Sequence, residues 1–188
     1  RGVKTYKHQR GKNSFEYAWS AAHLSAVYRD LGDLDKPIEL LNESLNFYNN
    51  YLEENHALQG WIKYHLGSAY RLKGDRKKAK KLLQESLAIN EIHYNKNHIT
   101  SARILNSLSK IGVVDKNFVE SRGYLERALK IYLSNNNHFD RYKAYESLGD
   151  LYREIFRSGE DPVARQKSLD NFRKAMAVVR GSFSADSA

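Results

Sequence analysis

Histidine is the residue type in this chain that most readily suggests catalysis or metal binding, since it can act as an acid, a base or a ligand. The sequence has seven histidines. Five of them follow an internal period of the chain: His23, His56, His65, His98 and His138. Because the repeat itself accounts for these five, we interpret them as structural. His8 and His93 remain, and neither has metal-ligand spacing to the other or to a carboxylate cluster.

Motifs for catalysis or nucleotide binding do not occur in the sequence. There is no HExxH, GxxxxGKS/T, GxSxG or GxGxxG, and no pair of carboxylates stands out as a general acid and base. We therefore predict no catalytic residue, no metal site and no cofactor. The chain starts at Arg1, so we expect it to be part of something longer, in which an enzymatic domain remains possible.

Composition predicts a soluble helical protein. Of the 188 residues, 41% are apolar and 28% charged, with only two prolines and no cysteine. The absence of cysteine excludes disulfides and thiolate zinc sites. The longest aliphatic run, at 111–114, is too short for a membrane span, and we expect a cytoplasmic location. The net charge of +9 fits an acidic peptide, nucleic acid or a membrane surface as partner, or no binding role at all.

An internal repeat determines the architecture that must position any site. Leu24, Leu66 and Leu108 are 42 residues apart, and Leu148 follows 40 residues later. A small residue comes next each time: Ser25, Gly67, Ser109 and Gly149. The segments 40–47, 82–89 and 124–131 repeat with the same period, with a fourth copy at 171–178 after an insertion near 158–163.

Each repeat predicts two helices joined by a tight turn. In the second repeat, Gly74 suits the end of the first helix and Asp75 the N-cap of the next. At the start of the chain, Asn13 with Glu16 predicts the cap of the first helix. The small residue after each framework leucine lets two helix backbones approach closely.

This pattern resembles the tetratricopeptide repeat. The framework leucines and the small residues after them stand at its Leu-Gly positions, and its tyrosine position holds Tyr28, Tyr70 and Tyr152. The 42-residue period and the Asn-His pair before each new helix resemble the longer subclass typified by kinesin light chain. The resemblance implies an all-α, right-handed α-solenoid of about four helix-turn-helix repeats, at about 14–55, 56–97, 98–137 and 138–180. Residues 1–13 read as a basic flexible segment and 181–188 as a disordered tail.

The resemblance also implies a concave groove lined by the first helix of each repeat. The groove candidates are Trp19, Arg29, Trp61, Tyr64, Arg71, Arg103, Asn106, Lys110, Lys143 and Arg153. A row of arginines grips carboxylates bidentately, and Trp61 and Tyr64 offer apolar faces beside it. This combination favours a peptide that carries acidic residues around a hydrophobic anchor. The alternative is that the arginines pair with acidic neighbours inside the solenoid. An equal alternative for the tryptophans is that both pack at the interface between stacked repeats.

A second basic feature lies at 71–81, on the turn and the start of the following helix. Besides Arg71, the cations of this basic rim are Lys73, Arg76, Lys77, Lys78, Lys80 and Lys81. We interpret it as a solvated face of an amphipathic helix, with contact to a phosphate backbone or an anionic membrane as the alternative.

The function predicted from the sequence is a protein-interaction scaffold that binds an acidic peptide or partner segment in the groove. Three alternatives stay open. The first is a ligand-sensing regulatory arm of a larger multidomain protein. The second is nucleic-acid or anionic-surface binding through the basic rim. The third is a structural array that forms homo-oligomers.

Overall fold

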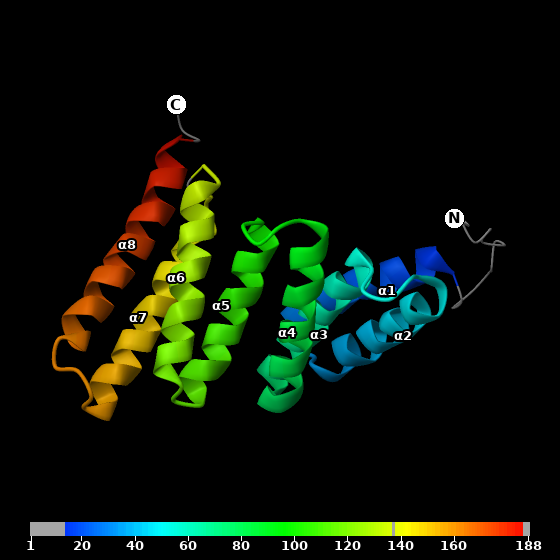
Figure 1. Ribbon diagram of the computed structural model, residues 1–188, viewed down its shortest axis with the longest axis horizontal. Helices are drawn as coiled ribbons and strands as arrows, with labels where there is room; N and C mark the ends of the chain where they lie inside the picture. Colours follow the sequence, from blue (N-terminus) through cyan, green and yellow to red (C-terminus); the bar gives the residue numbers. More distant parts are fainter. Residues whose placement is uncertain (1–13, 137, 186–188) are drawn as a thin grey trace. The chain divides into compact units, whose positions relative to one another are not determined.

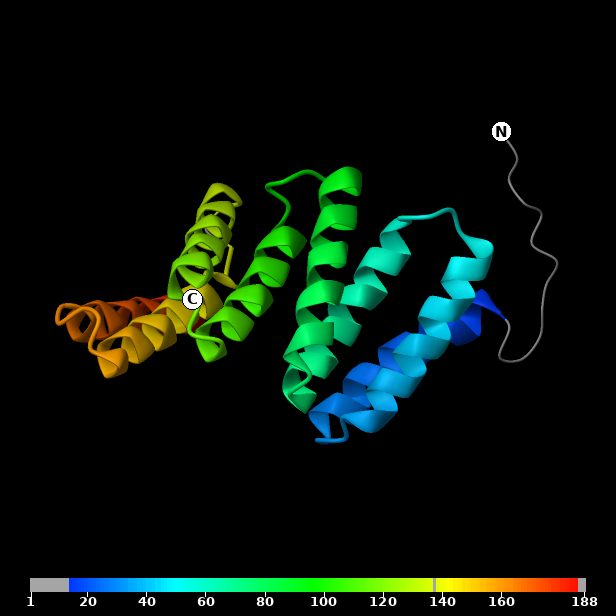
Figure 2. The ribbon, with the colours of Figure 1, turned by 60° about the horizontal axis from the view of Figure 1, so that its bottom comes forward.

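The computed structural model describes residues 14–136 and 138–185, and these form helices and turns only (Figures 1 and 2). Eight helices in this part of the chain make four hairpins. Their bounds are α1 Phe15–Asp30, α2 Asp35–Tyr51, α3 Ala57–Lys73, α4 Arg76–His93, α5 Ile99–Val114, α6 Phe118–Ser134, α7 Arg141–Ser158 and α8 Ala164–Ala185. The predicted all-α architecture of four helix pairs is confirmed.

The hairpins fall into two compact units, which are described separately. The first comprises α1 to α4, with the boundary at His93, and the second comprises α5 to α8. In the first unit α2 packs between its partner α1 and the next helix α3, and α3 packs on α4. In the second, α6 packs between α5 and α7 in the same way, and α7 packs on α8.

The periodic histidines after asparagine start the first helices of the later repeats. The His56 Nδ1 accepts a hydrogen bond from the Leu58 N–H at 3.2 Å, and the His98 Nδ1 accepts from the Thr100 N–H at 3.3 Å. The His138 Nδ1 accepts from the Asp140 N–H at 3.2 Å. The His56 and His98 rings thereby satisfy a backbone donor that the helix leaves open, whereas the His138 ring holds the turn before α7, whose N-cap is Asp140. The structural interpretation of these three histidines is confirmed.

The turn between α3 and α4 has the predicted chemistry. Gly74 has a left-handed backbone with φ of 89°, which glycine adopts without a steric penalty. The Asp75 Oδ1 then accepts a hydrogen bond from the Lys78 N–H at 3.1 Å and caps α4. The predicted cap of α1 is wrong by one residue, because the Ser14 Oγ accepts from the Tyr17 N–H at 3.1 Å. Asn13 lies outside the described residues.

Each unit has its own core, built from the periodic apolar positions. In the first unit Leu41 and Tyr48 of α2 pack with Ile62 and Leu66 of α3. In the second, the buried cluster is Phe118, Leu125, Leu148, Leu151, Ile155 and Ala164. The framework leucines of the second and fourth hairpins, Leu66 and Leu148, are thus each buried against the second helix of the preceding hairpin.

Small residues bring the two helices of a hairpin together, as predicted. The Ser44 Oγ donates a hydrogen bond to the Ala18 carbonyl at 2.8 Å, and the Ser86 Oγ donates to the Gly60 carbonyl at 2.7 Å. A Cβ on Gly67 would lie only 2.9 Å from the Leu83 Cγ. At Gly67 the framework position after the leucine is therefore small for a steric reason.

The predicted disordered tail at 181–188 is wrong for its first five residues, because α8 continues to Ala185. Gly181 does not adopt the left-handed backbone that ends α3 at Gly74 and α7 at Gly159, so nothing stops the helix there. The insertion near 158–163 forms the longer turn before α8. The predicted flexible segment 1–13 and residues 186–188 lie outside the described part of the chain.

Candidate peptide-binding site

An aromatic ladder connects the first helices of the two hairpins in the first unit. It consists of Trp19 and His23 on α1 and of Trp61 and His65 on α3. The two indoles stack at 5.5 Å between ring centroids, with an interplanar angle of 22°. Each indole also contacts the histidine one turn later on its own helix, at 4.5 Å on α1 and 4.6 Å on α3. The His23 ring lies 5.2 Å from Trp61 and so joins the two pairs.

The helical geometry and the 42-residue period together produce this ladder. Residues four apart lie on one face of a helix, so each tryptophan meets its histidine. The period places the same pair at the same height on the next first helix. We predicted the two tryptophans as groove residues but treated His23 and His65 as structural only. Each histidine follows a tryptophan by four residues, and this shared spacing was the signal in the sequence that could have identified the pairs.

His65 is a half-buried member of the ladder. Burial lowers its pKa from 6.5 to about 4, and the positive charge of Arg29 and the ring of His23 act in the same direction. The imidazole is therefore neutral at neutral pH. Trp19, in contrast, is 47% exposed, so the ladder presents an aromatic face to solvent at α1.

Arg71 lies on the same face of α3 as Trp61 and Tyr64, since the three residues follow helical spacing. Its Nε is buried and has no hydrogen-bond partner among the described residues. Burial lowers the pKa of this guanidinium, and nearby Tyr64 raises it, with no carboxylate among the causes. An arginine stays charged under these conditions, so Arg71 is a partly desolvated cation without an acidic partner among the described residues.

Two other predicted groove arginines do have acidic partners on their own helices. The Arg29 Nη2 lies 3.1 Å from the Asp30 Oδ1. The Arg153 Nη2 lies 2.7 Å from the Asp150 Oδ1, and its Nε lies 3.8 Å from the Glu154 Oε1. These pairs fit the alternative prediction, in which the groove arginines pair locally.

In the second unit two predicted groove cations converge on one carboxylate. The Arg103 Nη2 and the Lys143 Nζ lie 2.7 and 3.0 Å from the oxygens of Asp140. Burial, the largest single effect, raises the pKa of Asp140, but the hydrogen bonds from Lys143 and Arg103 together hold it below its ordinary value. This cluster joins α5 to the start of α7, and its two cations and one carboxylate leave a net charge of +1.

Asn106 is buried, and its Oδ1 has no hydrogen-bond partner in the described part of the chain. Lys110 follows one turn later on α5, and its side chain interacts with neighbouring groups. The ten predicted groove residues thus divide between the units, with Trp19, Arg29, Trp61, Tyr64 and Arg71 in the first and the others in the second.

Comparison with known proteins connects this geometry to a family. Residues 10–92 match the family model described as tetratricopeptide repeat. The crystal structure of BtubC (BKLC) from P. vanneervenii is similar over 94% of this chain and 67% of that chain, with a TM-score of 0.75 and 18% identity. No curated protein matches the sequence.

Two further structures contain nearly identical TPR-like repeats, from a Podosopora anserina protein assigned to the kinesin light chains. One covers 90% of this chain and 98% of its own, with a TM-score of 0.61 and 17% identity. The other is a substituted form of those repeats. It covers 93% of this chain and 99% of its own, with a TM-score of 0.57 and 15% identity. The repeats within residues 10–92 are tetratricopeptide repeats. The predicted tetratricopeptide repeat is confirmed over residues 10–92, and the similar structures confirm the predicted helical-repeat fold.

Tetratricopeptide repeats generally mediate protein–protein interactions on a non-enzymatic scaffold. Within the described ranges, no group of three or more histidine or acidic residues is arranged to hold a metal ion. No helix in the same ranges combines the length and apolar character needed to cross a membrane.

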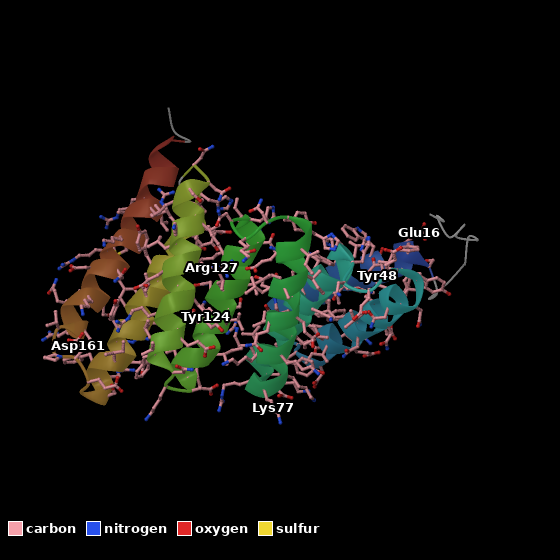
Figure 3. All side chains as sticks on the ribbon, in the orientation of Figure 1. Glu16, Tyr48, Lys77, Tyr124, Arg127 and Asp161 are labelled. Atoms are coloured by element: carbon pink, nitrogen blue, oxygen red, sulfur yellow. The ribbon has the colours of Figure 1, made fainter. Side chains whose placement is uncertain are left out.

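The basic rim of the second tetratricopeptide repeat is exposed and in part paired. Lys73 forms an ion pair with Asp35 on α2. The Lys78 Nζ lies 3.3 Å from the Asp75 Oδ2 and 5.1 Å from the centre of the Tyr70 ring. Lys81 lies 3.9 Å from Glu85, and Arg76 and Lys80 interact with neighbouring groups as well. Lys77 lies exposed at the start of α4 (Figure 3).

Proposed function

We propose that this chain is a protein-interaction scaffold whose first two tetratricopeptide repeats bind an acidic segment of a partner protein. The observation that carries the proposal is Arg71, a partly buried guanidinium whose Nε has no hydrogen-bond partner in the described residues. Leaving such a donor unsatisfied costs about 1–3 kcal/mol, and a ligand carboxylate would recover that cost. Arginine and carboxylate also match in geometry, because the guanidinium can donate two parallel hydrogen bonds.

The aromatic ladder supplies the apolar half of the same ligand site. Trp61 and Tyr64 share the face of α3 that carries Arg71, and Trp19 extends the apolar surface onto α1. A hydrophobic side chain of the partner would pack on the exposed indole of Trp19. The expected motif is therefore one acidic residue close to one large apolar residue, rather than a purely acidic tract.

The remaining groove cations contribute less in this proposal. Arg103 and Lys143 already share Asp140, and Arg29 and Arg153 already pair with acidic residues on their own helices. A ligand carboxylate at these sites would replace an existing ion pair rather than satisfy an open donor, so the net gain in binding free energy is small. Asn106 and Lys110 remain candidates for a polar contact in the second unit.

The test measures binding of fluorescently labelled peptides by anisotropy. A pool of peptides with an acidic residue beside an apolar one is compared with a neutral pool of the same length and apolar content. Arg71→Gln removes the charge, and Arg71→Lys keeps it but loses the planar fork. The matched control, Lys77→Gln, removes one cation from the neighbouring basic rim.

The acidic pool is expected to bind the wild type, and Arg71→Gln is expected to weaken binding by about ten-fold or more, which corresponds to roughly 1.4 kcal/mol. Arg71→Lys should lie between the two, and Lys77→Gln should bind like the wild type. Equal affinity for both pools, or a loss with Lys77→Gln alone, would contradict the proposal. The latter result would favour contact through the basic rim.

A further inference from the structure

The outer face of α1 exposes apolar residues at positions that are buried in the later hairpins. Leu24 is 45% exposed, whereas its equivalents Leu66 and Leu148 are 2% and 6% exposed. Val27 is 54% exposed, whereas its equivalents Ala69 and Leu151 are 1% and 0% exposed. Leu31, one turn further along, is 77% exposed. Leu24, Val27 and Leu31 make one continuous stripe, which we name the α1 outer face.

The structure shows twice what covers this face when it is buried. In the first unit Leu66 of α3 packs against Leu41 and Tyr48 of α2. In the second unit Leu148 and Leu151 of α7 pack against Leu125 of α6. In both, the second helix of a preceding hairpin is the cover. The α1 outer face is therefore shaped to receive the second helix of a tetratricopeptide hairpin.

The matching half of that interface is exposed on α8 of the same chain. Leu169 is 44% exposed, and Met176, seven residues later, is 53% exposed. By the repeat, Leu169 corresponds to Ile38, and Met176 corresponds to Leu45 and Leu129. These three equivalents are partly buried and packed against the cores that include the following helix. We name Leu169 and Met176 the α8 outer face.

Charge complements the apolar match. Helix α8 carries five cations and one acidic residue: Arg165, Lys167, Asp170, Arg173, Lys174 and Arg180. Helix α1 carries two acidic residues, Glu16 and Asp30, and one arginine. The Asp30 side chain is 72% exposed and pairs with Arg29, so α1 has a net charge of −1. Opposite charges around an apolar centre favour association of these two faces over association of either face with itself.

We propose that the α1 outer face of one copy of this chain packs against the α8 outer face of another copy. The contact is heterologous, since two different surfaces meet, so each added copy leaves one face open for the next. Copies therefore add head to tail, and the mean size rises with concentration. This surface is separate from the Arg71 site, and the proposal does not depend on the proposed peptide ligand.

The test uses two surface variants and their mixture. Leu24→Lys/Val27→Lys blocks the α1 outer face, and Leu169→Lys/Met176→Lys blocks the α8 outer face. Lysine has good helix propensity and the replaced side chains are already exposed, so the fold is retained, which circular dichroism checks. Val119→Lys, at an 83% exposed position on α6, is the matched control. Mean mass is measured by sedimentation or light scattering over a concentration series.

The wild type and Val119→Lys are expected to gain mass with concentration beyond a dimer. Each double variant alone should stay monomeric, with an association constant at least about ten-fold weaker. An equimolar mixture of the two double variants should form a dimer and stop there, because each supplies the one intact face that the other needs. A wild type that is monomeric throughout would overturn the proposal. So would either double variant that dimerises alone, or a mixture that stays monomeric.

Discussion

His56 and His98 each accept a hydrogen bond from a backbone N–H two residues later, at the start of α3 and α5. His23 and His65 instead lie in the aromatic ladder between α1 and α3. All four rings follow the same 42-residue period. A shared period therefore identifies residues with equivalent positions, but the neighbours of each position determine what the side chain does there.

The burial of His65 makes the stability of the first unit dependent on pH. Its pKa is about 4 in the folded chain and about 6.5 when unfolded, so the unfolded chain binds more protons between these values. The stabilisation is fully present above about pH 6.5 and is lost as the pH falls toward about 4. This difference corresponds to a loss of up to about 3 kcal/mol.

Denaturant unfolding of the wild type and of His65→Gln at about pH 7 and pH 4 checks this expectation. The free energy of unfolding should fall less in His65→Gln than in the wild type. His93→Gln replaces an exposed histidine and should retain the wild-type loss. An equal loss of unfolding free energy in all three proteins would show that His65 does not cause the pH dependence of stability. Arg29 and His23 face the His65 ring from α1 and are unchanged in both variants.

At the scale of the helices, close packing requires glycine where a Cβ would collide with the neighbouring helix. Gly67 and Gly123 are both helix-interior glycines with an ordinary negative φ. A Cβ on Gly67 would lie 2.9 Å from the Leu83 Cγ and 3.2 Å from the Ala79 carbonyl, whereas a Cβ on Gly123 would meet nothing within 4 Å. Only the first of these two glycines is required by its surroundings.

Valine at these two positions separates the steric effect from helix propensity. Gly67→Val is expected to lower the free energy of unfolding by about 2 kcal/mol or more, because the core residue Leu83 has no room to move. Gly123→Val should be neutral or more stable by a few tenths of a kcal/mol, since valine has the better helix propensity. Chemical denaturation of both variants measures the difference. Equal effects would show that the α3–α4 contact accommodates a larger residue.

At the scale of the whole molecule, each hairpin depends on its neighbours for burial. Helix α3 has a helix on both sides, since it packs against α2 and α4. Helix α1 packs against α2 and exposes Leu24 and Val27. In repeat proteins, stability is roughly a sum of such nearest-neighbour contacts, so a helix with one packed neighbour opens more easily than a helix with two.

Amide hydrogen exchange at low protein concentration tests this gradient. We expect the amides of α1 to exchange about ten-fold or more faster than those of α3, because local opening of α1 disrupts fewer buried contacts. The equivalent helix α3 serves as the internal control for sequence and length. If the amides of α1 exchange as slowly as those of α3, the α1 outer face is covered.

Much of the fold followed from the period in the sequence. The copied leucine, small residue and tyrosine predicted the hairpins because every hairpin must bury the same face in the same way. The turn at Gly74 and Asp75 followed from backbone chemistry that acts within a few residues. The continuation of α8 past Gly181 did not follow, because a glycine ends a helix only if its backbone turns left-handed, which residue type alone does not decide.

The sequence by itself therefore determined the helical-repeat fold, the helix pairs and the helix on which each predicted groove residue lies. Only the tertiary structure decided which groove cations are paired. Arg103 reaches Asp140 across 37 positions of sequence, while Arg71, on the predicted groove face of α3, has a buried Nε without a partner among the described residues. The physical reason is that periodicity fixes where a side chain lies on its helix. Its burial and ion pairs depend on the side chains that neighbouring helices bring within a few ångströms, which no local pattern records.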